Sequence, residues 1–334
     1  QRVSRGEFKL SGDAIRMSTF EPLPMRLRAP VQGFPKGWYR VADSKELGAG
    51  ALLPVSWFND QFIVYRDADG RAQVAGAFCP HMGAHLASHD GCLRDGRIVC
   101  PFHKWEFDAA SGNCAHIPYS ALPPGGASLE LHPTRELDGM VLMWYHPRGS
   151  APEFEPFESP LSRSQDGWVF YGVKEWTTTC PMRDMLENLF DGPHIVYLHN
   201  GGGAPELKSV QRTPYGMCVE YLADPATTDA GLTGFRSDFT GITMNAQIFE
   251  GTAFATQFYN TFTPIDDERF VLHSRLYLRD SGSAEINEAI GKAFTERFVF
   301  EVEQDLAVLN FKRHLPKPRL CAGDGPIHQY RKYA

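Results

Sequence analysis

Hydrophobic and polar positions in the first half of the chain alternate over short distances, a pattern typical of strands rather than helices. Between Gly37 and Pro147, apolar segments of strand length recur, and turn signals such as Asp95-Gly96 and Asp138-Gly139 separate them. The pattern predicts strands at residues 38–41, 51–58, 61–66, 72–78, 97–100, 129–131 and 139–145. We therefore expect a small all-β domain at residues 37–147.

The second half of the chain combines strand-like and helical patterns. Residues 148–167 hold Pro, Ser, Gly and charged side chains without periodicity, which indicates a linker. Residues 168–334 are expected to form a second, mixed domain. Its predicted elements are a strand at 168–173, a helix at 182–190 ended by Gly192-Pro193, alternating strands and turns over 208–280, and one long helix at 284–314.

Residues 1–36 form an N-terminal arm in this interpretation. Residues 21–37 are rich in proline and predict an extended segment. Residues 1–16 are polar, lack the apolar region of a secretory signal, and precede Met17, a candidate natural start. We therefore leave residues 1–16 out of the fold, as a segment that need not belong to the natural protein.

Composition narrows the class of protein. The chain has 334 residues, 43% of them hydrophobic, which is enough for sizeable cores. Its net charge of -7 and scattered basic residues argue against nucleic-acid binding, and the absence of a long apolar run predicts no membrane span. Seven cysteines, an odd number in a large chain, favour a reducing, cytoplasmic location in which Cys and His ligate metals.

Two Cys-His pairs stand out in the all-β segment, Cys79-Pro-His81 and Cys100-Pro-Phe-His103. Zinc uses the same residue types, but zinc-binding pairs commonly keep a two-residue gap in each pair. Here each pair joins one thiolate to one imidazole across unequal gaps. That matches a Rieske 2Fe-2S cluster, in which two Cys hold one iron and two His the other. The remaining cysteines and the nearby His85 and His89 are expected to have other roles.

A second group of metal-binding residue types comprises Asp191, His194 and His199. A five-residue step turns about 500° on an ideal helix, which would leave the two imidazoles ~140° apart. Gly192-Pro193 interrupts the incoming helix, and a widened turn or a helix end there would let the two side chains converge. Alone, the pattern also fits two polar surface histidines on an irregular helix.

The long C-terminal helix offers a carboxylate as a third ligand. On a helical projection, Asp305 lies in the middle of an apolar stripe. The stripe comprises Phe294, Phe298, Val302 and Leu309. A carboxylate there is costly unless it is paired with Arg or Lys or bound to a metal, and with two His it completes a ligand face for Fe(II) that leaves positions open for O2. Glu301 is the reserve ligand, and Glu303 is expected to be solvated.

With these residues in hand, the sequence resembles the catalytic α-subunit of Rieske non-haem iron oxygenases from about Gly37 to Leu315. The resemblance rests on CPHMGAHL at 79–86, CPFHKWEFD at 100–108, ENxxDxxHxxxxH at 187–199, and EQD ending at Asp305. It implies an α+β fold. A small all-β Rieske domain would be joined to a larger, helix-grip-like antiparallel-sheet catalytic domain with a long C-terminal helix.

The resemblance also implies roles for the site residues. The cluster ligands would be Cys79, His81, Cys100 and His103, and the ligands of a mononuclear iron would be His194, His199 and Asp305. Asp191 matches the bridging aspartate, which links His194 to His103 of a neighbouring subunit as an electron route and so implies a homo-oligomer, usually a trimer. Asn188 matches a polar position near the iron. Trp105 matches the aromatic residue beside the cluster and fits ordinary core packing equally well.

The branch of the family is indicated by Met82, which follows the first His where many aromatic-ring members carry Arg. With IPYS at 117–120, the sequence is similar to the steroid-acting branch, which includes 3-ketosteroid 9α-hydroxylase oxygenases and cholesterol 7-desaturases. The 23 phenylalanines fit a large apolar pocket as well as a core. Unlike membrane-anchored desaturases, the sequence shows no anchor helix, which favours a soluble enzyme.

We therefore expect an oxidoreductase that takes electrons from a ferredoxin or a flavin reductase, with NAD(P)H acting only indirectly. The expected reaction is hydroxylation of an apolar, steroid-like substrate with O2, as a monooxygenase rather than a dioxygenase. An aromatic-ring dioxygenase and an O- or N-demethylase are alternatives on the same scaffold. A Rieske electron carrier would not need Asp191, His194, His199 and Asp305, and a structural zinc protein would be colourless.

Overall fold

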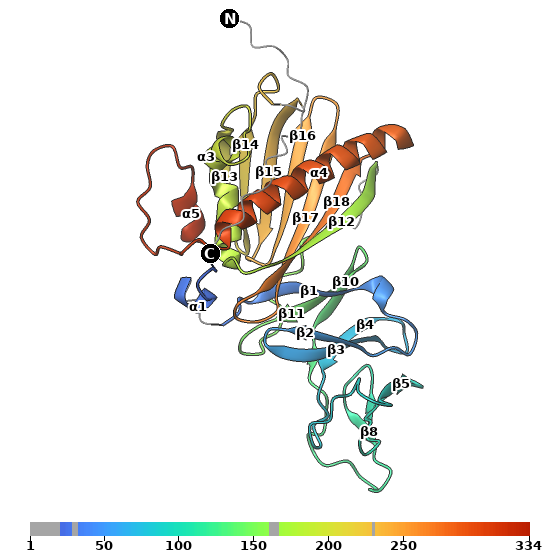
Figure 1. Cartoon of the computed structure of the whole chain (residues 1–334). Helices are drawn as coiled ribbons and strands as arrows, with labels where there is room; N and C mark the ends of the chain where they lie inside the picture. The colour runs from blue at the N-terminus through green and yellow to red at the C-terminus, as the bar shows by residue number, and fades with distance from the viewer. Residues whose placement is uncertain (1–20, 29–32, 160–166, 229–230) are drawn as a thin grey trace, which may run out of the picture.

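The computed structural model describes residues 21–28, 33–159, 167–228 and 231–334, so the interpretation of residues 1–16 lies outside the described part. Antiparallel sheets dominate the molecule, in two groups of strands (Figure 1). The N-terminal group comprises β1 (Gly37–Asp43), β2 (Leu53–Trp57), β3 (Asp60–Arg66), β4 (Ala72–Gly76), β5 (Cys92–Arg94), β6 (Arg97–Val99), β7 (Glu106–Asp108), β8 (Cys114–His116), β9 (Leu131–His132), β10 (Thr134–Leu137) and β11 (Met140–Tyr145).

These N-terminal strands form three small sheets, ordered β1-β11-β10, β2-β3-β4-β9 and β5-β6-β7-β8. Two-residue turns at Phe58-Asn59, Asp95-Gly96 and Asp138-Gly139 close three hairpins, and both residues of each turn have positive φ. A two-residue turn with positive φ at both positions matches the twist of the flanking strands, and Asn and Gly adopt this conformation readily. Sequence analysis missed β5, β7, β8 and β10, because three or four residues are too few to show a period.

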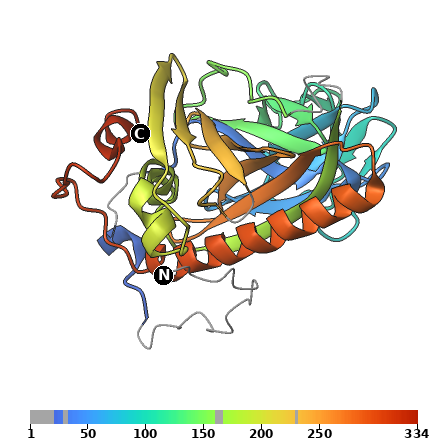
Figure 2. The same ribbon diagram turned by 90° about the horizontal axis from the view of Figure 1, so that it is seen from above.

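The C-terminal group of strands forms one seven-stranded sheet in the order β12-β18-β17-β16-β15-β14-β13. Its strands are β12 (Trp168–Thr178), β13 (Glu206–Thr213), β14 (Gly216–Leu222), β15 (Leu232–Thr240), β16 (Met244–Gly251), β17 (Ala255–Pro264) and β18 (Phe270–Arg279). The helix α4 (Ala284–Leu309) lies across one face of this sheet (Figures 1 and 2). The predicted long helix is therefore present, although it ends at Leu309 rather than at residue 314.

The segment predicted as a helix at 182–190 is helical throughout, as α2 (Met182–Glu187) followed directly by the 3-10 turn η2 (Asn188–Phe190). It ends before Asp191, and a further helix that was not predicted, α3 (Gly192–Tyr197), follows. Gly192-Pro193 thus begins a helix instead of only ending one, because proline in the first turn loses no hydrogen bond. The other helical segments are α1 (Met25–Arg28), which interrupts the arm predicted as extended, η1 (Ser44–Glu46) and α5 (Ile327–Arg331).

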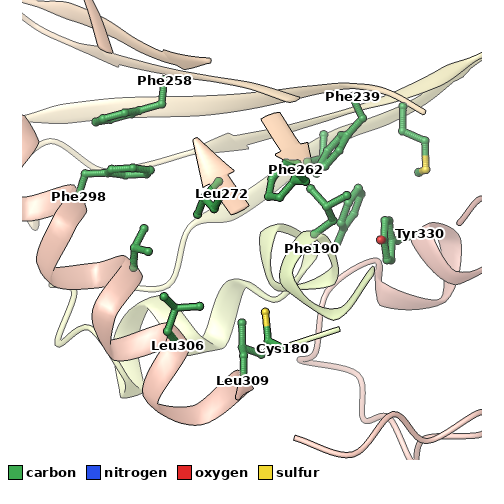
Figure 3. Close-up of a cluster of buried hydrophobic side chains, with 14 of the residues drawn as sticks. Cys180, Phe190, Phe239, Phe258, Phe262, Leu272, Phe298, Leu306, Leu309 and Tyr330 are labelled. Carbon is green, nitrogen blue, oxygen red and sulfur yellow. The ribbon is translucent and has the colours of Figure 1, made fainter. Parts of the chain in front are cut away.

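The large sheet is buried on both faces. On the face covered by α4, Phe258 and Phe262 of β17 pack with Phe298 of the helix (Figure 3). The alternate residue Tyr259 points to the opposite face, where it packs with Trp38 and other side chains of β1 and β11. The sheet β1-β11-β10 therefore packs on the face of the large sheet opposite α4, and the other two N-terminal sheets lie farther from it (Figure 1). In the described part of the chain, no helix has both the length and the apolar character needed to cross a membrane.

Candidate metal centres

The two Cys-His pairs lie in two loops of matching backbone geometry. The amides of Cys79 and Cys100 each donate to the carbonyl five residues further on, at 2.9 and 2.8 Å. The carbonyl of each Cys accepts from the amide four residues further on, that of Gly83 or Lys104, and both of these residues have positive φ. The same pattern of local hydrogen bonds thus places each of the two cysteines at the equivalent position of its loop.

The four side chains of these loops differ in exposure. Cys79 and Cys100 are each 2% exposed, whereas His81 and His103 are half-buried, with ring centroids 4.7 Å apart. Burial, together with the neighbouring Cys100 thiol, raises the pKa of the Cys79 thiol to about 12. A cation bound at this position would offset the cost of ionising the buried Cys79 thiol. The donor set of two inner thiols and two outer imidazoles fits a Rieske cluster.

The residues around the cluster loops have specific contacts. The indole of Trp105 stacks on the His81 ring, with 4.5 Å between centroids, and its N–H donates to the Tyr119 hydroxyl at 2.7 Å. His85 Nδ1 accepts from a backbone amide at 3.2 Å, and the exposed His89 lies 3.0 Å from Asp90. Trp105 therefore lies against a predicted ligand, whereas the two flanking histidines have partners of their own.

His194, His199 and Asp305 lie together, with one ligating atom of each within 4.8 Å of the others. The amides of Leu198 and His199 both bond the carbonyl of His194, at 2.8 and 3.3 Å, so the last turn of α3 widens as it ends. The two imidazole centroids are 5.0 Å apart. The helix end that a five-residue spacing requires is thus present, and α4 supplies the carboxylate from the other side.

Each of these imidazoles is oriented by a hydrogen bond at Nδ1. His199 Nδ1 donates to Gln304 Oε1 at 3.0 Å, and His194 Nδ1 donates to the carbonyl oxygen of Asp191. The lone pair of each ring is therefore on Nε2, as a metal ligand requires. Asn188 Nδ2 lies 3.2 Å from Nε2 of His194. Sequence analysis gave Gln304 no role, since only the packing of α4 against α3 shows that it faces His199.

Asp305 is 8% exposed, and its Oδ1 lies 3.2 Å from Nε2 of His199. This oxygen makes no hydrogen bond within the described residues, and no Arg or Lys of that part pairs with it. Burial lowers the pKa of His199, but the Asp305 carboxylate, the hydrogen bond to Gln304 and the charge of Glu301 together raise it more, so the net shift is upward. The arrangement favours a positive charge between the two side chains, which a divalent metal supplies.

The other acidic side chains near the site are differently placed. Glu303 is exposed, as expected, and Glu301, the reserve ligand, accepts from Arg297 Nε at 2.5 Å. Asp191 contacts His194 through its carbonyl oxygen, and burial raises the pKa of its carboxyl. Its predicted contact with His103 concerns a second chain and stays a prediction.

A largely apolar cavity opens beside the three predicted iron ligands, between the sheet and the helices α2, α3 and α4. Its apolar walls include Leu189, Phe235, Phe249, Phe262, Leu272, Phe298 and Val302. Three amide side chains of the sheet interrupt this surface, those of Asn245, Gln247 and Asn260. The cavity therefore suits an apolar molecule with few polar groups.

Two family profiles match the chain. That of the Rieske [2Fe-2S] domain matches residues 37–125, and that of the 3-ketosteroid 9α-hydroxylase C-terminal domain matches residues 143–334. Among curated proteins, cholesterol 7-desaturase of Bombyx mori is 35% identical over 90% of this chain and 68% of its own. The oxygenase component of 3-ketosteroid-9-alpha-monooxygenase from Rhodococcus rhodochrous is 26% identical over 91% of this chain and 80% of its own.

Solved structures share the fold at lower identity. Dicamba monooxygenase bound to dicamba superposes with a TM-score of 0.70 and 18% identity, over 90% of this chain and 96% of that one. NdmA of Pseudomonas putida CBB5 with caffeine gives a TM-score of 0.71 and 18% identity, over 88% of both chains. At this level of identity the likeness is one of fold, and it covers both groups of strands.

Proposed function

Because the chain belongs to the Rieske oxygenases that carry a 3-ketosteroid 9α-hydroxylase C-terminal domain, we propose that it hydroxylates an apolar, steroid-like substrate as the oxygenase component of a multiprotein system. The observation that carries the proposal is the site of His194, His199 and Asp305, which opens into an apolar cavity. An electron carrier has no use for such a site.

In this proposal Cys79, His81, Cys100 and His103 hold the cluster, and His194, His199 and Asp305 hold the iron. When bound, the iron supplies activation of O2 and the cluster supplies electrons. The Gln304 amide and the Asp191 carbonyl keep the protons of the two imidazoles on Nδ1, so that both Nε2 atoms face the site. Three protein donors would leave further positions of a bound iron to oxygen and substrate.

The substrate class is proposed from the cavity and the relatives together. The relatives are named for cholesterol and for 3-ketosteroids, both rigid and largely apolar molecules. The phenylalanine-rich cavity of this chain offers matching apolar surface, and its few amides offer hydrogen bonds to isolated oxygens. An apolar polycyclic body with one or two oxygen functions therefore fits this surface best.

We further propose a ferredoxin or flavin reductase as electron donor, a homotrimer in which Asp191 bridges to His103 of the next chain, and a cytoplasmic location. A relative named as an oxygenase component supports the separate donor. Sedimentation of the purified protein tests the trimer, and a monomer that turns over at full rate would contradict the bridging role.

The experiment that tests the proposed reaction is coupled turnover with a panel of 3-ketosteroids, sterols and aromatic acids, with the product masses measured. A gain of one oxygen on a steroid is the expected result. Loss of a methyl group would identify a demethylase, and a gain of two oxygens a dioxygenase. Electron consumption without any product from the panel would contradict the steroid assignment.

A further inference from the structure

A second cavity lies outside the metal site, between β12, β18 and the N-terminal half of α4. Its floor is apolar and includes Leu276 and the rings of Phe258 and Phe298. Lys174 of β12 and Lys292 of α4 also line it, and both are exposed. We call it the outer cavity, and the cavity beside the predicted iron ligands the inner cavity.

A thin partition of side chains separates the two cavities. The Phe298 ring lines both of them and stacks on Phe258, with 3.8 Å between centroids and 15° between planes (Figure 3). Beside this pair, Ser274 of the outer cavity donates to Asn260 of the inner cavity at 2.5 Å. Phe298 is the residue that the linings of the two cavities share, so a rotation of its side chain would change the partition between them.

The partition is close to Asp305, one of the predicted iron ligands. Phe298 precedes Asp305 by seven residues, which is two turns or about 10 Å along α4. The outer cavity continues in the same direction as far as Lys292. With the Phe298 ring in place, a rigid substrate can extend from the predicted iron ligands for about 10 Å before it meets this ring. A longer substrate has to displace the ring.

We propose that Phe298 sets the length of substrate that the site accepts, and that the outer cavity takes the far end of an elongated substrate. This inference rests on the proposed function only for the chemical class of the substrate. The far end would be apolar where it crosses Phe258 and Leu276. It would end in an oxygen acceptor, since Lys174, Lys292 and the buried hydroxyl of Thr295 line the remaining space, together with Glu296, which lies 4.0 Å from Lys292. That hydroxyl has no hydrogen-bond partner in the described part of the chain.

The test compares dissociation constants of short and long ligands for the cluster-loaded protein, measured by calorimetry. One pair is a 3-ketosteroid without a side chain and a 3-ketosteroid with a long side chain at its opposite end. The other pair is 4-ethylphenol and 4-octylphenol. Phe298→Ala should raise the preference for the longer member, taken as the ratio of the two dissociation constants, about three- to tenfold. This factor corresponds to the free energy of one aromatic pair. Phe298→Leu, which preserves more of the core, should raise it in the same direction.

A matched control is available one turn earlier on α4. Phe294 packs on Phe254, with 4.7 Å between centroids, and lines neither cavity, so Phe294→Leu should leave the length preference unchanged. A raised preference with the phenols but no steroid binding would contradict the steroid class and support the role of Phe298. An unchanged preference in both Phe298 variants, or a failure of all four ligands to bind, would overturn the role of Phe298.

Discussion

The two predicted metal centres are assembled in different ways by the same chain. The four cluster residues lie within positions 79–103, on two loops whose geometry is fixed by hydrogen bonds inside each loop. The predicted iron ligands come from α3, from the residues just after it and from α4, with the strands β13 to β18 between α3 and α4 in the sequence. The first centre is thus local, and the second exists only when the large sheet has folded and α4 lies across it.

The difference determines what supports each centre. The cluster loops sit at the outer end of the small sheets, where Met82 and Phe102 are exposed. The iron site is surrounded by the largest core, in which Leu306 and Phe298 of α4 pack against the sheet. We therefore expect the cluster to be robust to changes in the large sheet. The iron site should respond to single changes on α4.

The largest expected effect separates the two centres completely. Asp305→Ala removes the carboxylate of the predicted ligand set His194, His199 and Asp305, and turnover should fall by more than the roughly 10–100-fold that loss of a supporting hydrogen bond costs. The visible absorption of the cluster should persist while the iron content per chain drops. Glu303→Ala, an exposed position on the same helix, is the control and should retain activity. Full activity of Asp305→Ala would remove Asp305 from the ligand set.

The next prediction concerns the link between the centres. Asp191→Asn keeps the carbonyl oxygen that holds His194 and changes only the carboxylate. Iron content and chemical reduction of the cluster should therefore be unchanged, whereas product formation should collapse because the bridge to a neighbouring His103 is altered. Single-turnover product yield from the pre-reduced protein measures this directly. A normal yield would mean that electrons reach the iron site by another route.

The same contrast explains how much the sequence predicts. Cys79, His81, Cys100 and His103 are predicted as ligands from their spacing alone, because a local motif keeps its geometry wherever the loops are placed. Asp305 is predicted only because a carboxylate interrupts an apolar stripe on a long helix. Gln304 carries no such signal, since its role depends on how α4 is rotated against His199.

The fold follows the same rule. The long helix and the strands with clear alternation are predicted from the sequence. The turns at Asp95-Gly96 and Asp138-Gly139 are predicted as well, because Asp-Gly is a turn signal. The short strands β5, β7 and β8 around the cluster loops are not, because three residues are too few to show a period. The end of the helix before Asp191 is predicted from Gly192-Pro193, but α3 is not, because the same Gly-Pro pair that ends one helix also begins the next.

A smaller effect is expected when an iron ligand keeps its place but loses its support. Gln304→Leu removes the acceptor for His199 Nδ1, and the affinity for Fe(II) should fall about 10–100-fold. Gln304→Glu retains an oxygen acceptor and should recover most of this affinity, which a purely structural role of Gln304 would not require. Competition with a chromophoric chelator gives the affinity, and cluster absorption should be identical in all three proteins. Equal iron affinity in Gln304→Leu would show that packing alone orients His199.

The smallest expected effect lies at the cluster, where the loops hold their own geometry. Trp105→Phe retains a ring on His81 but loses the hydrogen bond to the Tyr119 hydroxyl, which contributes about 0.5–1.5 kcal/mol to the free energy of unfolding. Tyr119→Phe removes the same bond from the other side, so a double-mutant cycle isolates it from the change in packing. Denaturation followed by cluster absorption measures the free energies, with the number of irons per cluster unchanged. If either variant lost the cluster outright, the cluster loops would depend on distant support as strongly as the iron site, and the contrast between a local and an assembled centre would fail.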